Sequence, residues 1–304
     1  MRILRLGNSE DISPGLEDQQ RAWYVGAREL EAAIGEPVEI VVRPIFPTPD
    51  LPQLVRKWID EAQPDLVFLK VTWYWYGYES VPRRIERLLG RAGKPIAKAG
   101  LNAAAKPGLA HNRTFRFGRR MAHRIIGGDT QVPTSQVLRV MEECIRTIIA
   151  RENIALVVKG TGDGRREEEG LQGYFGRFQK RREEVEGSIE RLCKELHVPY
   201  TGTRRNQSLP SDKPSGDLIH RGASAHERMG RNEAAAMLEA WQAFTADHTP
   251  PSPPATTNPT SPRPDREGGC DAGLTTMSRT ERTSPRKRSI TIACPSPHLP
   301  DGRI

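Results

Sequence analysis

The chain has 304 residues, a formal net charge of +8, 36% hydrophobic residues and 25 prolines. That length suits one large domain or two small ones. No stretch of about 18 apolar residues occurs, which excludes an apolar transmembrane helix. The four cysteines have neither close pairs nor metal-ligand spacing, which excludes a disulfide framework and a zinc finger. We expect Cys144 and Cys193, on apolar helical stripes, to be reduced core residues.

Apolar segments alternate with amphipathic ones along most of the chain. Strands are predicted at 2–7, 38–43, 65–71, 154–159 and, more briefly, near 198–201. Apolar residues spaced by three or four predict helices at 23–34, 137–148, 185–196 and from about Ala223 to Phe244. Strands alternating with helices predict an α/β fold, a parallel sheet covered by helices on both faces. Ligands of such sheets bind at the carboxyl ends of the strands.

The segment from Trp73 to Gln136 interrupts this alternation. It contains a helical stretch, Pro82–Leu89, and a strongly basic stretch between Lys94 and Arg124. An insertion of this length at the carboxyl edge of a sheet predicts a cap over a site. The alternative is a set of extra helices on the sheet edge with their basic faces in water. No nucleic-acid-binding motif accompanies the charge, so no nucleic acid is expected as partner.

The last part of the chain, 247–304, contains 11 of the 25 prolines, many Ser and Thr, and no apolar periodicity. Such a composition buries too little apolar surface to offset the entropy of ordering, which predicts a disordered tail after a domain spanning 1–246. A Pro-rich partner motif or the basic cluster at 286–288 remains an alternative use of the tail.

Two short segments near opposite ends of the predicted domain carry chemistry. Gly7-Asn8-Ser9 closes the first predicted strand, and Asp217-Leu218-Ile219-His220 precedes the last predicted helix. A serine hydroxyl is a weak nucleophile that requires a base, and a histidine oriented by a carboxylate is such a base. If the two segments meet, Ser9, His220 and Asp217 form a nucleophile, a base and an orienting group. The other histidines, including His226, are expected to be structural or on the surface.

These segments resemble the first and last motif blocks of the SGNH/GDSL hydrolases, a family of serine esterases and lipases. Leu6-Gly7-Asn8-Ser9 is similar to the Gly-Asp-Ser-Leu block, and 216–220 is similar to the Asp-x-x-His block. The resemblance covers about 1–245. It implies a three-layer α/β/α fold with a flavodoxin-like parallel sheet of about five strands, the catalytic roles given above for Ser9, His220 and Asp217, and no metal or organic cofactor.

The chain departs from the family at the groups that bind the oxyanion. Asn8 replaces the aspartate of the first block. The family's second-block glycine is absent after the second strand, where the Thr48 backbone N–H is a candidate substitute. The family's Gly-x-Asn block is replaced by 71–76, which contains Thr72 and Tyr74.

Asn102 or Asn112 becomes a candidate for the missing amide if the insertion folds over the pocket. The aromatic run 73–76 fits an apolar wall for an acyl chain, a stacking surface for a sugar, or plain packing beneath the insertion.

The sequence thus predicts a serine hydrolase acting on a small-molecule, saccharide or lipid ester. A binding module of the same fold that has lost turnover is the alternative, and a third is a protein that uses the basic insertion to hold an acidic lipid, a polysaccharide or nucleic acid. No signal-peptide pattern opens the chain, so a cytoplasmic location is expected. The oligomeric state is left open.

Overall fold

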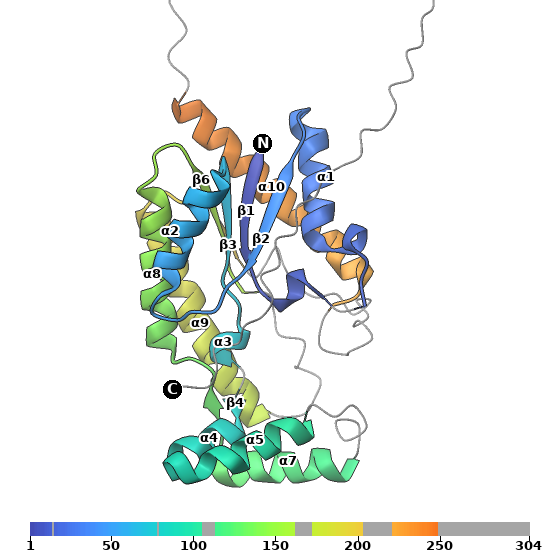
Figure 1. Cartoon of the computed structure of the whole chain (residues 1–304), viewed down its shortest axis with the longest axis vertical. Coiled ribbons are helices and arrows are strands. Elements are labelled where there is room, and N and C mark those ends of the chain that lie inside the picture. Colours follow the sequence, from blue (N-terminus) through green and yellow to red (C-terminus); the bar gives the residue numbers. More distant parts are fainter. Residues whose placement is uncertain (14, 78, 105–112, 162–171, 203–220, 249–304) are drawn as a thin grey trace, which may run out of the picture.

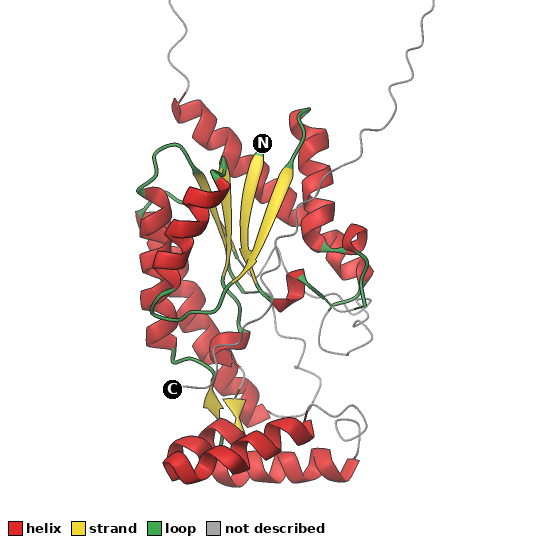
Figure 2. Ribbon diagram, in the orientation of Figure 1, coloured by secondary structure: helices red, strands yellow, loops and turns green. Residues whose placement is uncertain are grey.

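The computed structural model describes residues 1–13, 15–77, 79–104, 113–161, 172–202 and 221–248. Within these ranges a parallel β-sheet stands between two layers of helices (Figures 1 and 2). The predicted α/β class with a sheet covered on both faces is therefore confirmed.

The sheet has five strands in the order β2-β1-β3-β6-β7, and all of its neighbours pair in parallel. The strands are β1 (Arg2–Gly7), β2 (Glu39–Pro44), β3 (Leu66–Lys70), β6 (Ala155–Lys159) and β7 (Tyr200–Thr201). This is the flavodoxin-like order. Strands are added toward one edge of the sheet from β1 to β2 and toward the other edge from β3 onward, so the strand order reverses between β1 and β3. Ligands of such folds bind beyond the carboxyl ends of these two strands.

Successive side chains along each strand point to opposite faces of the sheet, and a separate hydrophobic core lies on each face. Leu4 and Leu6 face one side of β1, with α2 (Leu51–Ala62), α8 (Thr134–Ile149) and α9 (Gln172–Glu195). Ile3 faces the other, with α1 (Ala22–Ile34) and α10 (Ala223–His248). The central strands β3 and β6 are buried along their whole length, because helices cover both of their faces.

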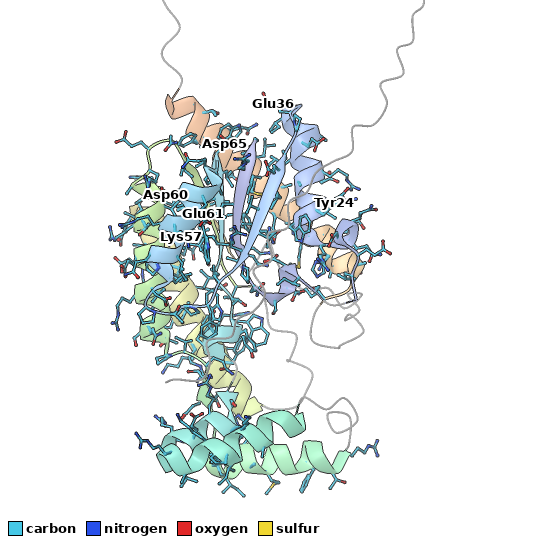
Figure 3. The ribbon with its side chains drawn as sticks, viewed as in Figure 1. Tyr24, Glu36, Lys57, Asp60, Glu61 and Asp65 are labelled. Carbon is cyan, nitrogen blue, oxygen red and sulfur yellow. The ribbon has the colours of Figure 1, made fainter. Side chains whose placement is uncertain are left out.

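Helix α2 illustrates how the helical layers are built. Val55 and Ile59, one turn apart, are buried against the sheet. Lys57, Asp60 and Glu61 point outward on the opposite face (Figure 3). An apolar stripe at a spacing of about four residues is what fixes a surface helix to a sheet.

The long insertion forms a small helical unit of its own. Its elements are α3 (Tyr74–Gly77), β4 (Glu79–Ser80), α4 (Val81–Leu89), η3 (Gly90–Ala92), α5 (Gly93–Ala104), α7 (Arg113–Ile126) and β5 (Asp129–Thr130). Glu79 accepts a hydrogen bond from Arg181 of α9 at 2.7 Å, and the Val132 N–H donates to the Trp75 carbonyl. The unit lies on the side of the sheet at which the strands end (Figure 1). Its use as a cap stays a prediction.

The final helix α10 is longer than predicted. It continues to His248, and Phe244 stacks on Trp241 with ring centroids 5.9 Å apart. The expected domain boundary at 246 therefore falls in the last turn of this helix, while 249–304 lie outside the described residues. No helix within the described ranges is long and apolar enough to cross a membrane. Cys144 and Cys193 are free and buried, as expected.

Leu69, in β3, tests the core assignment. Leu69 is fully buried, so Leu69→Ala should lower the free energy of unfolding by about 2–5 kcal/mol. The matched change Leu88→Ala, at an exposed leucine, should alter it by about 0.5 kcal/mol or less. Urea unfolding of both variants measures the difference, and equal effects would contradict the assignment.

Candidate functional site

The turn after β1 lies at the point where the direction of the sheet reverses. Gly7 ends the strand, Asn8 is extended, and Ser9 opens the short helix η1 (Ser9–Asp11) with an exposed side chain. Figure 1 shows this turn just beyond the end of β1. The Ser9 carbonyl accepts the N–H groups of Ile12 and Ser13. Among the described residues, nothing accepts a hydrogen bond from the Ser9 N–H or hydroxyl, so both groups remain available to a ligand.

Asn8 connects the end of β1 to the end of β3. Its Nδ2 donates to the Thr72 hydroxyl oxygen at 3.0 Å. Thr72 follows β3 and is only 6% exposed. Because the Thr72 oxygen accepts this bond, its own hydroxyl proton can be donated to another group.

A buried ionic cluster underlies the turn. Arg5 of β1, Lys70 of β3 and Lys159 of β6 are buried on neighbouring strands together with two acids, Asp11 and Glu233. Arg5 lies between the acids, with nitrogen–oxygen distances of 2.7 Å to Asp11 and 2.8 Å to Glu233. Lys70 contacts Asp11 at 3.0 Å, and Lys159 donates to Glu233. The cluster therefore ties both η1 and α10 to the sheet.

Asp11 holds the serine-bearing turn in place. Its Oδ1 accepts from Arg5 and Lys70, and its Oδ2 accepts from the Asn8 N–H at 3.0 Å. Burial alone would raise the pKa of Asp11, but the charges of Arg5 and Lys70 and these hydrogen bonds hold it well below its usual range. A β-carbon on Gly7 would overlap the Asp11 carboxylate, so this approach requires glycine.

His226 is a structural residue with fixed roles for both ring nitrogens. It is 0% exposed; its Nδ1 accepts the Ala22 N–H at 3.0 Å, and its Nε2 lies 3.1 Å from the Ser13 hydroxyl oxygen. An accepting Nδ1 requires the proton on Nε2, so His226 cannot take a proton from Ser13. The Ser13 hydroxyl itself donates to the Glu10 carbonyl at 2.7 Å. This pair is therefore not an activated nucleophile, and the expectation of a structural His226 is confirmed.

Glu10 brings the late part of the chain to the turn. Its Oε1 accepts the Arg221 N–H at 3.0 Å and lies 3.3 Å from His226 Nε2. Burial would raise the pKa of Glu10, but these two hydrogen bonds lower it to about 2. Glu10 follows Ser9 directly, and Arg221 follows His220 directly. The hydrogen bond between Arg221 and Glu10 therefore joins the residue after the predicted base to the residue after the predicted nucleophile.

Asp217, His220 and Asn112 themselves lie outside the described residues, so their predicted roles stay predictions. Asn102 falls within α5. Among the described side chains, no three His, Cys, Asp or Glu groups gather as ligands of a metal ion.

Thr48, the predicted substitute oxyanion donor, already uses its backbone N–H. That group donates to the Phe46 carbonyl at 2.7 Å. The Thr48 N–H could donate to an oxyanion only if its hydrogen bond to Phe46 broke.

The aromatic run divides between the core and the surface. Trp75 and Tyr76 are buried in the core, which is the packing alternative. Tyr74 is 47% exposed, and its ring lies 6.4 Å from that of Trp73. Only the first half of the run can therefore serve as the predicted wall for a ligand.

No protein-family model and no curated protein matches this chain. Solved structures that it resembles include TesA, at 13% identity and a TM-score of 0.48, with 79% of this chain and 99% of that chain covered. Another is Est24, a carbohydrate acetylesterase from Sinorhizobium meliloti, at 13% and 0.45, with 78% and 98% covered. A third is the esterase EstA from Pseudoalteromonas sp., at 10% and 0.45, with 80% and 98% covered. At this level of similarity the function must be inferred from the chain's own residues.

The ionic cluster is the feature that sequence reasoning missed. Its signal is visible in retrospect, because Arg5 lies between leucines of β1, and Lys70 and Lys159 end strands that are otherwise apolar. A charge inside a strand covered on both faces requires a buried partner. The identity of the partners, Asp11 and Glu233, follows only from the fold.

Gly7→Ala should displace the serine-bearing turn. The new methyl group would overlap the Asp11 carboxylate, so we expect a lower melting temperature by several degrees or failure to fold. Gly187→Ala, in α9, is the matched control, since a β-carbon there meets open space. It should leave the melting temperature unchanged or slightly raised. Equal melting temperatures for the two variants would contradict the described contact.

Stability should depend on acid through the buried carboxylates. The pKa values of Glu10 and Glu233 are lowered from 4.5 to about 2, so these groups stabilise the fold above pH 4.5 and lose that contribution as pH falls toward 2. Urea unfolding across this window should show a falling free energy of unfolding. The slope should be smaller in Glu10→Gln; an unchanged slope in that variant would contradict the role of Glu10.

Proposed function

We propose that this chain is a serine hydrolase that cleaves a carboxylic ester, with Ser9 as nucleophile, His220 as base and Asp217 as the group that orients the base. The catalytic domain is 1–246, and the tail lies outside it. No metal or organic cofactor takes part in this scheme.

The contact between Glu10 and Arg221 is the observation that carries the proposal. It joins the residue after Ser9 to the residue after His220 at 3.0 Å. Two segments more than 200 residues apart in sequence are thereby neighbours at the carboxyl end of β1, the position at which ligands of this fold bind. Nucleophilic acyl transfer requires a base beside the serine, and this contact supports that role for His220, the residue before Arg221.

The reaction follows from these groups. The Ser9 Oγ attacks the ester carbonyl carbon while His220 takes the hydroxyl proton, and Asp217 stabilises the resulting imidazolium. The tetrahedral intermediate collapses to an acyl-serine when His220 returns the proton to the leaving alcohol. Water, deprotonated by His220, then attacks the acyl-serine and releases the acid and free Ser9.

The oxyanion of the intermediate requires hydrogen-bond donors. The Ser9 N–H and the Thr72 hydroxyl proton are candidates, because neither has an acceptor among the described residues. The Asn8 amide, which already donates to Thr72, holds that hydroxyl in place. Each donor of this kind contributes about 10²–10³-fold in rate. Two such donors offset part of the loss of the family's glycine and asparagine blocks.

The substrate class is inferred from the aromatic residues that follow Thr72, the residue bonded to Asn8. Tyr74, about half exposed beside Trp73, provides an aromatic surface for an acyl chain or a sugar ring. We therefore propose a lipid or saccharide ester rather than a highly charged substrate.

The competing function is an ester-binding module without turnover. The observation that favours it is the Thr48 N–H, which is bonded to Phe46 and so is withdrawn from the oxyanion site. A protein of this kind would bind an ester or its analogue and not hydrolyse it.

Ser9→Ala decides between the two functions. Hydrolysis of p-nitrophenyl butyrate by the full chain should fall to the uncatalysed rate in Ser9→Ala, with an unchanged circular dichroism spectrum, because an exposed hydroxyl adds little stability. Ser13→Ala is the matched control, since that serine faces a histidine unable to act as base; it should retain turnover. Wild-type turnover in Ser9→Ala would exclude this serine, and absence of turnover in the folded wild type would favour the binding module.

A further inference from the structure

The charge of this chain is concentrated in one structural unit. The helices α4, α5 and α7, with the 3-10 turn η3 between α4 and α5, contain eleven Lys and Arg but a single acidic residue, Glu86. Their formal net charge of +10 exceeds the +8 of the whole chain, so all remaining residues together are net negative. An asymmetry of this size marks a surface for an anionic partner rather than a property of the whole fold.

The same helices expose large apolar side chains. Seven of the ten exposed large hydrophobic residues of the described part lie on them. Leu88 and Leu89 project from the end of α4, and Ile96 projects from α5. On α7, Phe117 is 65% and Ile125 is 75% exposed. Exposed apolar side chains in this number on one part of the chain are typical of an interaction site.

The apolar and basic side chains of α7 form adjoining stripes. Phe117, Met121 and Ile125 are spaced by four residues, which places them in one row along the helix. Arg113, which is exposed, lies four residues before Phe117 and so continues this row toward the start of the helix; Arg124, also exposed and about three turns further on, lies beside the end of the row. A helix with an apolar row flanked by arginines is suited to the boundary between headgroups and acyl chains of a bilayer.

The three helices act together because they lie side by side. Helix α4 packs against both α5 and α7 (Figure 1). Arg84 and Arg87 of α4 are paired with Asp129 of β5. The net positive charge of the three helices therefore comes mainly from their other basic residues. In Figure 2 these helices form a layer clearly separate from the sheet.

We propose that α4, α5 and α7 form a basic–apolar face that docks on the surface of an anionic phospholipid bilayer. Lipid headgroups supply the negative charge that the arginines and lysines require, and the acyl boundary receives Phe117, Ile125 and their apolar neighbours. Nucleic acid fits less well, because its phosphates offer nothing to the exposed leucines and isoleucines. Docking of this face requires no activity at Ser9.

Docking would bring the carboxyl ends of the strands toward the membrane, because the face lies on that side of the sheet (Figure 1). Ser9 and Tyr74 lie on the same side. The chain would then meet lipid-borne molecules at the surface where they reside.

Co-sedimentation of the full chain with vesicles tests the proposal. Vesicles of phosphatidylcholine containing phosphatidylglycerol should bind the chain, and pure phosphatidylcholine vesicles should bind at least about tenfold less, because the basic residues recognise anionic headgroups. Raising the salt concentration should weaken binding without abolishing it, since the apolar contribution is not screened.

Paired variants separate the two contributions. Phe117→Ser/Ile125→Ser should reduce binding to the anionic vesicles about tenfold, and Arg91→Glu/Arg113→Glu should do the same. The control Arg28→Glu/Arg146→Glu makes the same charge change at exposed arginines of the main domain and should bind as the wild type does. Circular dichroism verifies that each variant is folded.

Three results would overturn the proposal. One is failure of the wild type to bind anionic vesicles. Another is equal binding by the face variants and the control. The third is tight, salt-sensitive binding of double-stranded DNA with no binding of vesicles, which would assign the basic–apolar face to nucleic acid.

Discussion

The ion pairs of Asp11 are the interaction on which the rest of this structure depends. One carboxylate accepts from Arg5 of β1, Lys70 of β3 and the Asn8 N–H, and so fixes the first turn of the chain to β1 and β3. Buried ion pairs contribute little net stability, because desolvation consumes most of the attraction. Removing one partner, however, leaves a buried charge without a counter-charge, which lowers the stability of the fold by several kcal/mol. The cluster therefore enforces one position of the turn more than it stabilises the fold as a whole.

That position gives Ser9 its chemical setting. The turn follows β1 at the point where the strand order of the sheet reverses. Asn8 donates a hydrogen bond to Thr72, and Glu10 accepts one from the Arg221 N–H. The two layers of helices need no special residues here, since each is fixed by an ordinary apolar stripe. The site is instead built by polar groups that converge on three consecutive residues, 8–10. Such convergence at the carboxyl ends of parallel strands is how this architecture creates binding sites.

Much of the fold was predictable from the sequence, because local patterns determine it. The first strand was predicted with its exact bounds, since an apolar run ended by glycine leaves little ambiguity. Helix α10 was predicted to end at Phe244 but continues to His248, because the residues after Phe244 have no apolar repeat and yet permit a helix. The aromatic run 73–76 was predicted either to pack in the core or to form a wall for a ligand, and it does not follow one alternative throughout: Trp75 is buried, and Tyr74 is about half exposed. Only tertiary packing decides which ring points inward.

The polar part of the site was less predictable. Lys159 and Glu233 are 74 residues apart, and no local pattern pairs them. The bonded state of the Thr48 N–H and the ring orientation of His226 likewise depend on backbone geometry that residue types do not specify. By contrast, Ser9 at the end of β1 was predictable, because strand ends in an α/β fold are places where chemistry occurs.

Mapping of a covalent adduct tests the central claim, that the turn after β1 carries an activated serine. The full chain would be treated with a fluorophosphonate and the modified residue identified by mass spectrometry of its peptides. We expect a single adduct on Ser9 that disappears in His220→Ala. An adduct on Ser13 or another residue instead, or no adduct on well-folded protein, would contradict it.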